Sequence, residues 1–159
     1  MSKKRIVVIC PGRGTYTKET LGYLRQHGAF EQDFIKDIDR RREELGEPSI
    51  TELDSMETFT PQLHTRGEHA SSLIYACSYT DFMAIDREKF EIVAVTGNSM
   101  GWYLALAYGG ALDWEGGFQV VNTMGSMMKK EIIGGQVIYP VCGEDWRFSK
   151  ERWQATESA

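Results

Sequence analysis

A short apolar run that ends in a glycine-flanked serine is the feature that most constrains the fold of this chain. Glu91 to Thr96 contains the apolar, β-branched residues of a buried strand, and Gly97-Asn98-Ser99-Met100-Gly101 follows directly. The stretch from Trp102 to Tyr108 then predicts a helix. A serine on a sharp strand-to-helix turn is typical of nucleophilic sites, and its flanks are glycine because larger side chains would collide. The alternative is an ordinary tight turn in which Ser99 is only a small residue.

A second apolar run, Ile6 to Cys10, predicts another strand of the parallel kind that is buried on both faces. Helices are expected over residues 17–26, 30–45, 68–83, 114–132 (with Asp113 as N-cap) and 150–154, with a short helix opened by Ser49 and a third strand over 137–141. Strands that alternate with helices indicate an α/β fold with a parallel sheet.

Charge is distributed unevenly along the 159 residues, and this bears on the binding partners. The net charge is -5, and the segment from 31 to 57 is strongly acidic. No basic footprint for nucleic acid is present. The triplet Arg40-Arg41-Arg42 lies within the acidic segment, so we expect it on a solvated helix face.

The cysteines and the N-terminus indicate the compartment. Cys10, Cys77 and Cys142 are far apart and form no C-x-x-C pair, which disfavours both a disulfide framework and a metal site. The five apolar residues after the basic N-terminus are too few for a signal peptide or a membrane span. We therefore expect a cytoplasmic protein with reduced thiols and no membrane contact.

The loop after the first strand, Pro11-Gly12-Arg13-Gly14, is the expected second half of a serine site. Acyl transfer needs two donors for the developing oxyanion, and the backbone N–H groups of Met100 and of Arg13 are the candidates. A dinucleotide fingerprint is the competing interpretation of this loop. It requires a third glycine at position 17, which is Thr17, and is therefore disfavoured.

Three segments together resemble the malonyl-CoA:acyl-carrier-protein transacylases. The segment Gly97 to Leu106 resembles the G-H-S-L-G-E-Y motif of that family, Cys10 to Gly14 resembles its opening F-P-G-Q-G, and Ala105 to Met128 resembles its next helix. The resemblance runs from Ile6 to about Val141. It implies an α/β-hydrolase-like large subdomain over residues 1–135, with 136–159 as the barely begun, truncated ferredoxin-like small subdomain or a C-terminal tail.

The resemblance also implies a chemistry. Ser99 would take an acyl group from coenzyme A and pass it to the phosphopantetheine thiol of an acyl carrier protein, as in fatty acid or polyketide biosynthesis. The oxyanion would lie at the backbone of Arg13 and Met100, as the residue types alone indicate. Coenzyme A enters as part of the substrate, and no bound cofactor or metal is expected. An acyl-thioester hydrolase is an alternative with the same acyl-enzyme.

The acyl pocket is where this sequence departs from the family. Asn98 stands in place of a histidine, Trp102 in place of a glutamate, and Met124 in place of the arginine that pairs with the malonyl carboxylate. A buried carboxylate needs a cationic partner. We therefore expect a preference for neutral acyl groups such as acetyl or a short alkyl chain, with Arg13 as the alternative cation.

No histidine stands where the family places its general base. His27 is expected at a helix end, and His64 and His69 as solvated residues beside a loop. The base would then come from a missing C-terminal half or from a partner chain, and apolar surface on the last helices would favour self-association. A catalytically silent homologue that binds carrier protein is the remaining alternative.

Overall fold

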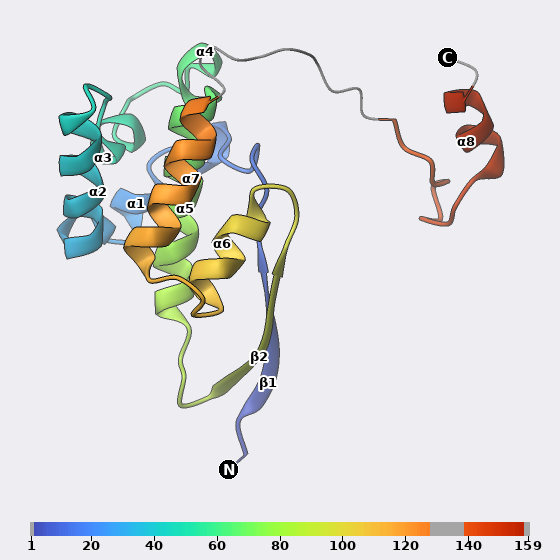
Figure 1. Cartoon of the computed structure of the whole chain (residues 1–159), viewed down its shortest axis with the longest axis horizontal. Helices are drawn as coiled ribbons and strands as arrows, with labels where there is room; N and C mark the ends of the chain where they lie inside the picture. The colour runs from blue at the N-terminus through green and yellow to red at the C-terminus, as the bar shows by residue number, and fades with distance from the viewer. Residues whose placement is uncertain (1, 128–138, 158–159) are drawn as a thin grey trace.

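Within the part of the chain that the structure describes, two parallel strands form the sheet, and helices cover one of its sides (Figure 1). The computed structural model describes residues 2–127 and 139–157. Strand β1 (Lys4–Cys10) pairs with β2 (Phe90–Gly97) so that Val8 lies beside Val95 and Cys10 beside Gly97. The register therefore brings the carboxyl ends of both strands, and the loops that follow them, to the same edge of the sheet.

The helices between and after the strands make up most of the described chain. In chain order they are η1 (Lys18–Thr20), α1 (Tyr23–Gln26), η2 (Ala29–Glu31), α2 (Asp33–Glu44), α3 (Ile50–Asp54), α4 (Pro61–His64), α5 (Gly67–Ala84), α6 (Gly101–Tyr108), α7 (Trp114–Ser126) and α8 (Lys150–Glu157). No helix within residues 2–127 and 139–157 is long and apolar enough to cross a membrane.

Helix α5 is the centre of the helical layer and packs against α3, α6 and α7. Its residues Leu73, Tyr75 and Ala76 are fully buried. The crossing with α7 is close, because a Cβ added at Gly125 would stand 2.6 Å from the Gly67 carbonyl oxygen. Glycine in α7 is thus required by the contact between helices, although glycine lowers helix propensity.

A buried arginine joins α2 to α5. Arg42 has no exposed surface; it donates hydrogen bonds to the carbonyl of Glu68 (2.9 Å) and the hydroxyl of Ser72 (2.9 Å), and its guanidinium lies 3.0 Å from the Glu47 carboxylate. The expectation of a solvated face is therefore wrong for Arg42. The cause is long-range: the guanidinium satisfies polar groups of α5 that the local sequence does not reveal.

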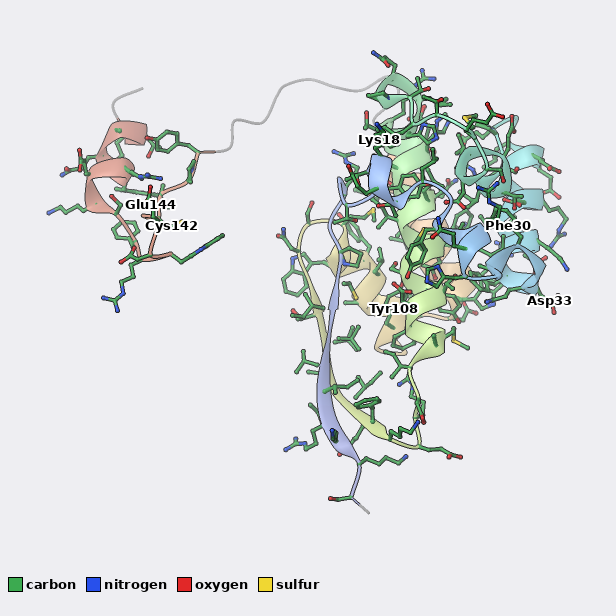
Figure 2. All side chains as sticks on the ribbon, turned by 180° about the vertical axis from the view of Figure 1, so that it is seen from behind. Lys18, Phe30, Asp33, Tyr108, Cys142 and Glu144 are labelled. Atoms are coloured by element: carbon green, nitrogen blue, oxygen red, sulfur yellow. The ribbon has the colours of Figure 1, made fainter. Side chains whose placement is uncertain are left out.

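The sheet is covered less than its sequence predicts. Val7 and Ile9 on β1 are 53% and 75% exposed, and Val93 on β2 is 40% exposed. Side chains of the strands project from the side away from the helices (Figure 2). The expectation that β1 is buried on both faces is wrong for this chain, because among the described residues helices cover one face alone.

Local helix signals were mostly reliable. The Asp113 side chain accepts a hydrogen bond from the Gly116 N–H (2.8 Å), and Ser49 accepts one from the Glu52 N–H (3.0 Å), which confirms both predicted caps. The helix expected over 17–26 is instead two short helices separated at Gly22, where φ is 84°. A left-handed residue interrupts the helical path, and glycine adopts that conformation without strain.

The C-terminal elements are described by themselves. The predicted boundary at 135/136, the end of the helix expected to reach 132 and the start of the strand expected at 137 lie outside the described residues. Within the described part, 139–141 is not a strand, and Cys142 forms an isolated antiparallel bridge with Phe148. Helix α8 is longer than the predicted 150–154.

Candidate functional site

Ser99 lies in the turn between β2 and α6 with a strained backbone. Its φ is 54°, in the left-handed region that residues other than glycine rarely adopt. Such a conformation costs on the order of 1–3 kcal/mol and persists only where the surrounding structure imposes it. The residue precedes α6 by two positions, so its side chain lies close to the N-terminal end of that helix.

The two flanking glycines impose this turn. A Cβ on Gly97 would stand 2.3 Å from the Gly101 carbonyl carbon, and a Cβ on Gly101 would stand 2.4 Å from the carbonyl oxygen of Cys10. Both clashes are with backbone, which has no flexible end to move. The first matches the collision expected from the sequence, and the second fixes the turn against the end of β1.

The loop after β1 lies directly beside Ser99. A Cβ on Gly12 would be 3.1 Å from the Asn98 carbonyl oxygen and 3.7 Å from the Ser99 Cβ. The Thr15 hydroxyl donates to the carbonyl of Gly12 at 3.1 Å and folds the loop back on itself. These contacts bring Arg13, the next residue, to the same cavity as Ser99.

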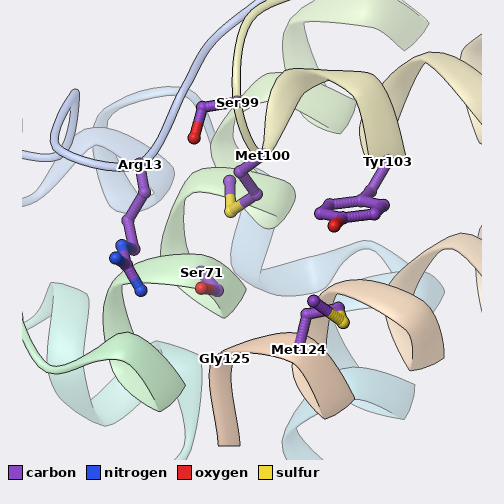
Figure 3. A pocket seen from close by; sticks show the side chains of 7 residues that line it. All are labelled: Arg13, Ser71, Ser99, Met100, Tyr103, Met124 and Gly125. Atoms are coloured by element: carbon purple, nitrogen blue, oxygen red, sulfur yellow. The ribbon is translucent and has the colours of Figure 1, made fainter. Parts of the chain in front are cut away.

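The cavity at this edge of the sheet has a volume of about 160 Å³. Its wall is drawn from four separate parts of the chain (Figure 3): Arg13, Ser71, Ser99, Met100, Tyr103, Met124 and Gly125. Met100, Tyr103 and Met124 make an apolar side, to which α6 and α7 contribute. Arg13, Ser71 and Ser99 supply the polar groups.

Four of the six predicted site residues meet in this cavity: Arg13, Ser99, Met100 and Met124. Asn98 is exposed, and Trp102 is 58% exposed; neither lines the cavity. The reason is helical geometry. Positions three apart share a helix face, so Tyr103 follows Met100 into the cavity, whereas Trp102 points elsewhere.

Three residues of the cavity wall were not predicted from the sequence: Tyr103, Ser71 and Gly125. Tyr103 could have been found from the helical spacing just described. Ser71 and Gly125 carry no local signal, because they reach the cavity only through the crossing of α5 and α7.

His64 is buried rather than solvated, and its ring is fully engaged. The side chain has no exposed surface; its Nδ1 lies 3.0 Å from the Thr60 N–H nitrogen and its Nε2 lies 3.1 Å from the Leu53 carbonyl oxygen. Both ring nitrogens lie within hydrogen-bond distance of backbone groups. His64 is thus a structural residue that ties α4 to α3.

The other two histidines are also placed away from the cavity. His69 is 4% exposed and its Nδ1 lies 3.0 Å from the Leu63 carbonyl oxygen; burial lowers the pKa of its ring below the usual value. The expectation of solvated rings is therefore wrong for His64 and His69. His27 ends α1, as expected, with its Nδ1 2.8 Å from the Tyr23 carbonyl oxygen. Among the described residues, the cavity wall contains no histidine and no carboxylate.

Metal ligands do not gather anywhere in the described ranges 2–127 and 139–157. No three side chains of His, Cys, Asp or Glu come close enough there to hold an ion. The thiol of Cys10, at the end of β1, is buried, which raises its pKa to about 11 and keeps it protonated at neutral pH.

Comparison with known proteins supports the fold. No protein-family model matches the sequence, and no curated protein matches it. Among solved structures, the malonyl-CoA:acyl carrier protein transacylase of Helicobacter pylori matches with 20% identity and a TM-score of 0.58, over 81% of this chain and 40% of that one. The malonyl CoA-acyl carrier protein transacylase of Clostridium perfringens ATCC 13124 matches with 24% identity and a TM-score of 0.59, over 83% of this chain and 40% of that one.

These matches confirm the predicted resemblance at the level of the fold. The chain spans 40% of the length of the transacylases that it resembles. The parallel strands and the helices on one side of them are consistent with part of that α/β fold.

Proposed function

We propose that Ser99 is the nucleophile of an acyltransferase that accepts acyl groups from coenzyme A and passes them to the phosphopantetheine thiol of a carrier protein. The observation that carries this proposal is the strained backbone of Ser99, at φ 54°, in the wall of a cavity. The shared fold with transacylases that act on malonyl-CoA and acyl carrier protein adds support.

The chemistry balances in two half-reactions. The Ser99 oxygen bonds to the thioester carbonyl carbon, the carbon–sulfur bond breaks, and the hydroxyl proton ends on the coenzyme A sulfur. The carrier thiol then attacks the new ester, its carbon–oxygen bond breaks, and the thiol proton returns to Ser99. The backbone N–H groups of Arg13 and Met100 would stabilise the oxyanion formed in each half.

The proton transfers need a base, and the described wall offers neither histidine nor carboxylate. The proposal therefore includes a base supplied by further sequence or by a partner chain. With this chain alone we expect a slow, stoichiometric acyl adduct rather than rapid turnover. The same observation favours a second candidate, a catalytically silent homologue that binds carrier protein.

The apolar side of the cavity bears on the acyl group. Met124 and Tyr103 present thioether and ring surface, which suits an uncharged acyl chain and offers no cation for a carboxylate. Arg13 reaches the same cavity from the opposite loop. On the strength of the Met124 and Tyr103 surface we propose neutral acyl groups as the preferred substrates, with Arg13 as the alternative cation for a carboxylate.

The test is the mass of the intact protein after incubation with acetyl-CoA. One acetyl adduct is expected, absent in Ser99→Ala and retained in Cys142→Ala, which removes the least buried thiol. An adduct that passes to a carrier protein supports transfer, whereas one that decays in water at the same rate without carrier indicates a hydrolase. Failure of every acyl-CoA to label Ser99 would leave the silent homologue.

A further inference from the structure

Ser71 is a buried hydroxyl that opens onto the Ser99 cavity. It is 3% exposed and lies on α5, where α7 crosses it so closely that a Cβ on Gly125 would stand 2.9 Å from the Ser71 oxygen. Figure 3 shows Ser71 across the cavity from Ser99, between Arg13 and Met124 in that view. The Ser71 side chain therefore lies in the wall that would face an acyl group attached to Ser99.

The other hydroxyls of α5 show what a buried serine ordinarily does in this helix. Ser72, Ser78 and Thr80 each donate to the carbonyl four residues earlier, at 3.2, 2.6 and 2.9 Å. No residue in the described ranges makes a hydrogen bond with the Ser71 side chain. The Ser71 hydroxyl is therefore open to the cavity, where a polar group that enters can pair with it.

The neighbours of Ser71 restrict what that group is. Met124 presents a thioether to the cavity, Tyr103 presents a ring with one hydroxyl, and Arg13 lines the same wall. An acyl carbonyl held by the backbone at Arg13 and Met100 would leave the rest of the acyl group pointing into this space. An oxygen farther along that chain would meet the Ser71 hydroxyl.

We infer that Ser71 is a specificity residue that binds an oxygen atom carried by the acyl chain beyond its carbonyl. The inference rests on the proposed acylation of Ser99. Beside the apolar Met124, this oxygen is that of a neutral hydroxyl or keto group; a carboxylate, which would meet Arg13 in the same wall, is the charged source of the same contact. A serine retained only for its small size at the helix crossing would show no such preference.

The experiment compares acylation of Ser99 by two donors of matched size, butyryl-CoA and 3-hydroxybutyryl-CoA. In the wild type we expect the hydroxylated donor to react about threefold to tenfold faster, the range of one neutral hydrogen bond. Ser71→Ala should bring the ratio close to one by slowing the hydroxylated donor alone. Ser78→Ala, which removes a paired hydroxyl on the same helix and away from the cavity, should leave the ratio unchanged.

A second pair of donors, propionyl-CoA and malonyl-CoA, identifies the source of the oxygen. A Ser71→Ala effect confined to malonyl-CoA would keep the role of Ser71 and assign the oxygen to a carboxylate. Equal slowing of all four donors, or no change in any ratio, would overturn the inference while leaving the acyl-enzyme intact. Absence of any Ser99 adduct would overturn the proposed function and this inference together.

Unfolding supplies an independent readout. Ser71→Ala removes no hydrogen bond within the described protein, so its denaturation midpoint should match the wild type, whereas Ser78→Ala loses bonds to Ile74 and Tyr108 and should unfold earlier. A clear loss of stability in Ser71→Ala would show that the hydroxyl has a structural partner, and would count against the inference.

Discussion

Helix α5 and strand β1 are both rich in apolar residues, yet the structure buries them to different degrees. In α5, Leu73 and Tyr75 are fully buried. On β1, Ile9 is 75% exposed and Val7 is 53% exposed. The difference lies in their neighbours, because α3, α6 and α7 pack around α5, while the helices of the described residues cover one side of the strands (Figure 1).

The comparison teaches that an apolar run in the sequence indicates a surface that is unfavourable to expose to water. The run does not indicate which other segment packs against that surface. The helical layer and the sheet also have different roles in the molecule. The helical layer carries the buried polar and apolar core, whereas the sheet ends carry the Ser99 turn. They meet at the joint where Gly101 lies against the Cys10 carbonyl.

The largest expected effect tests the helical side of this division. Arg42→Ala would remove the cation that lies 3.0 Å from Glu47 and would leave the Glu68 carbonyl and the Ser72 hydroxyl without that donor. Breaking a buried ion pair by removing one partner typically lowers stability by about 3–5 kcal/mol. The measurement is the free energy of unfolding in urea.

The matched control is the preceding residue. Arg41 pairs with Glu115 at the surface, and removing such a pair changes stability by less than about 1 kcal/mol. If Arg41→Ala and Arg42→Ala lower the free energy of unfolding equally, the buried network around Arg42 does not stabilise the protein. The contact between α2 and α5 would then not contribute to the burial of α5.

The sequence predicted those parts of the fold that local physics decides. The Asp113 and Ser49 caps, the span of α5 and the glycine turn around Ser99 each follow from spacing within a few residues. Arg42 pairs with Glu47 close by in the chain, but its burial against α5 also depends on Glu68 and Ser72, 26 and 30 residues away, and no local pattern shows these two partners.

The candidate site divides in the same way. Ser99, Met100 and Arg13 follow strand ends, and parallel strands bring such ends together, so their meeting was predictable. Met124 came from the resemblance. Ser71 required knowledge of how α5 crosses α7, which only the three-dimensional packing provides.

A medium effect is expected from the pH dependence of the helical core. Burial lowers the pKa of the His69 ring in the folded state, so between that pKa and the ordinary value near 6.5 the unfolded chain binds more protons. Stability contributed by His69 is fully present above about pH 6.5 and is lost as the pH falls, with a slope of at most about 1.4 kcal/mol per pH unit.

Urea unfolding between pH 5 and 8 measures this slope. His69→Gln removes the titrating ring and should flatten the profile in that window. A profile that stays as steep in His69→Gln as in the wild type would assign the slope to another group and would remove His69 from the buried core.

The smallest effect is expected on the sheet, where Val8 and Ile9 are neighbours on opposite faces of β1. Val8 packs against the core, so Val8→Thr buries a hydroxyl and should lower stability by about 1–2 kcal/mol. Ile9 is 75% exposed, so Ile9→Thr, which keeps the β-branch, should change stability by less than about 0.5 kcal/mol. Sedimentation velocity accompanies the unfolding measurement, because an uncovered apolar face can be buried between copies of the chain. A different outcome is that Ile9→Thr lowers the free energy of unfolding as much as Val8→Thr and shifts the sedimentation coefficient toward that of a monomer. The outer face of the sheet would then be covered by another copy of the chain in solution. In that case α5 is buried by contacts within the chain and β1 by contacts between chains.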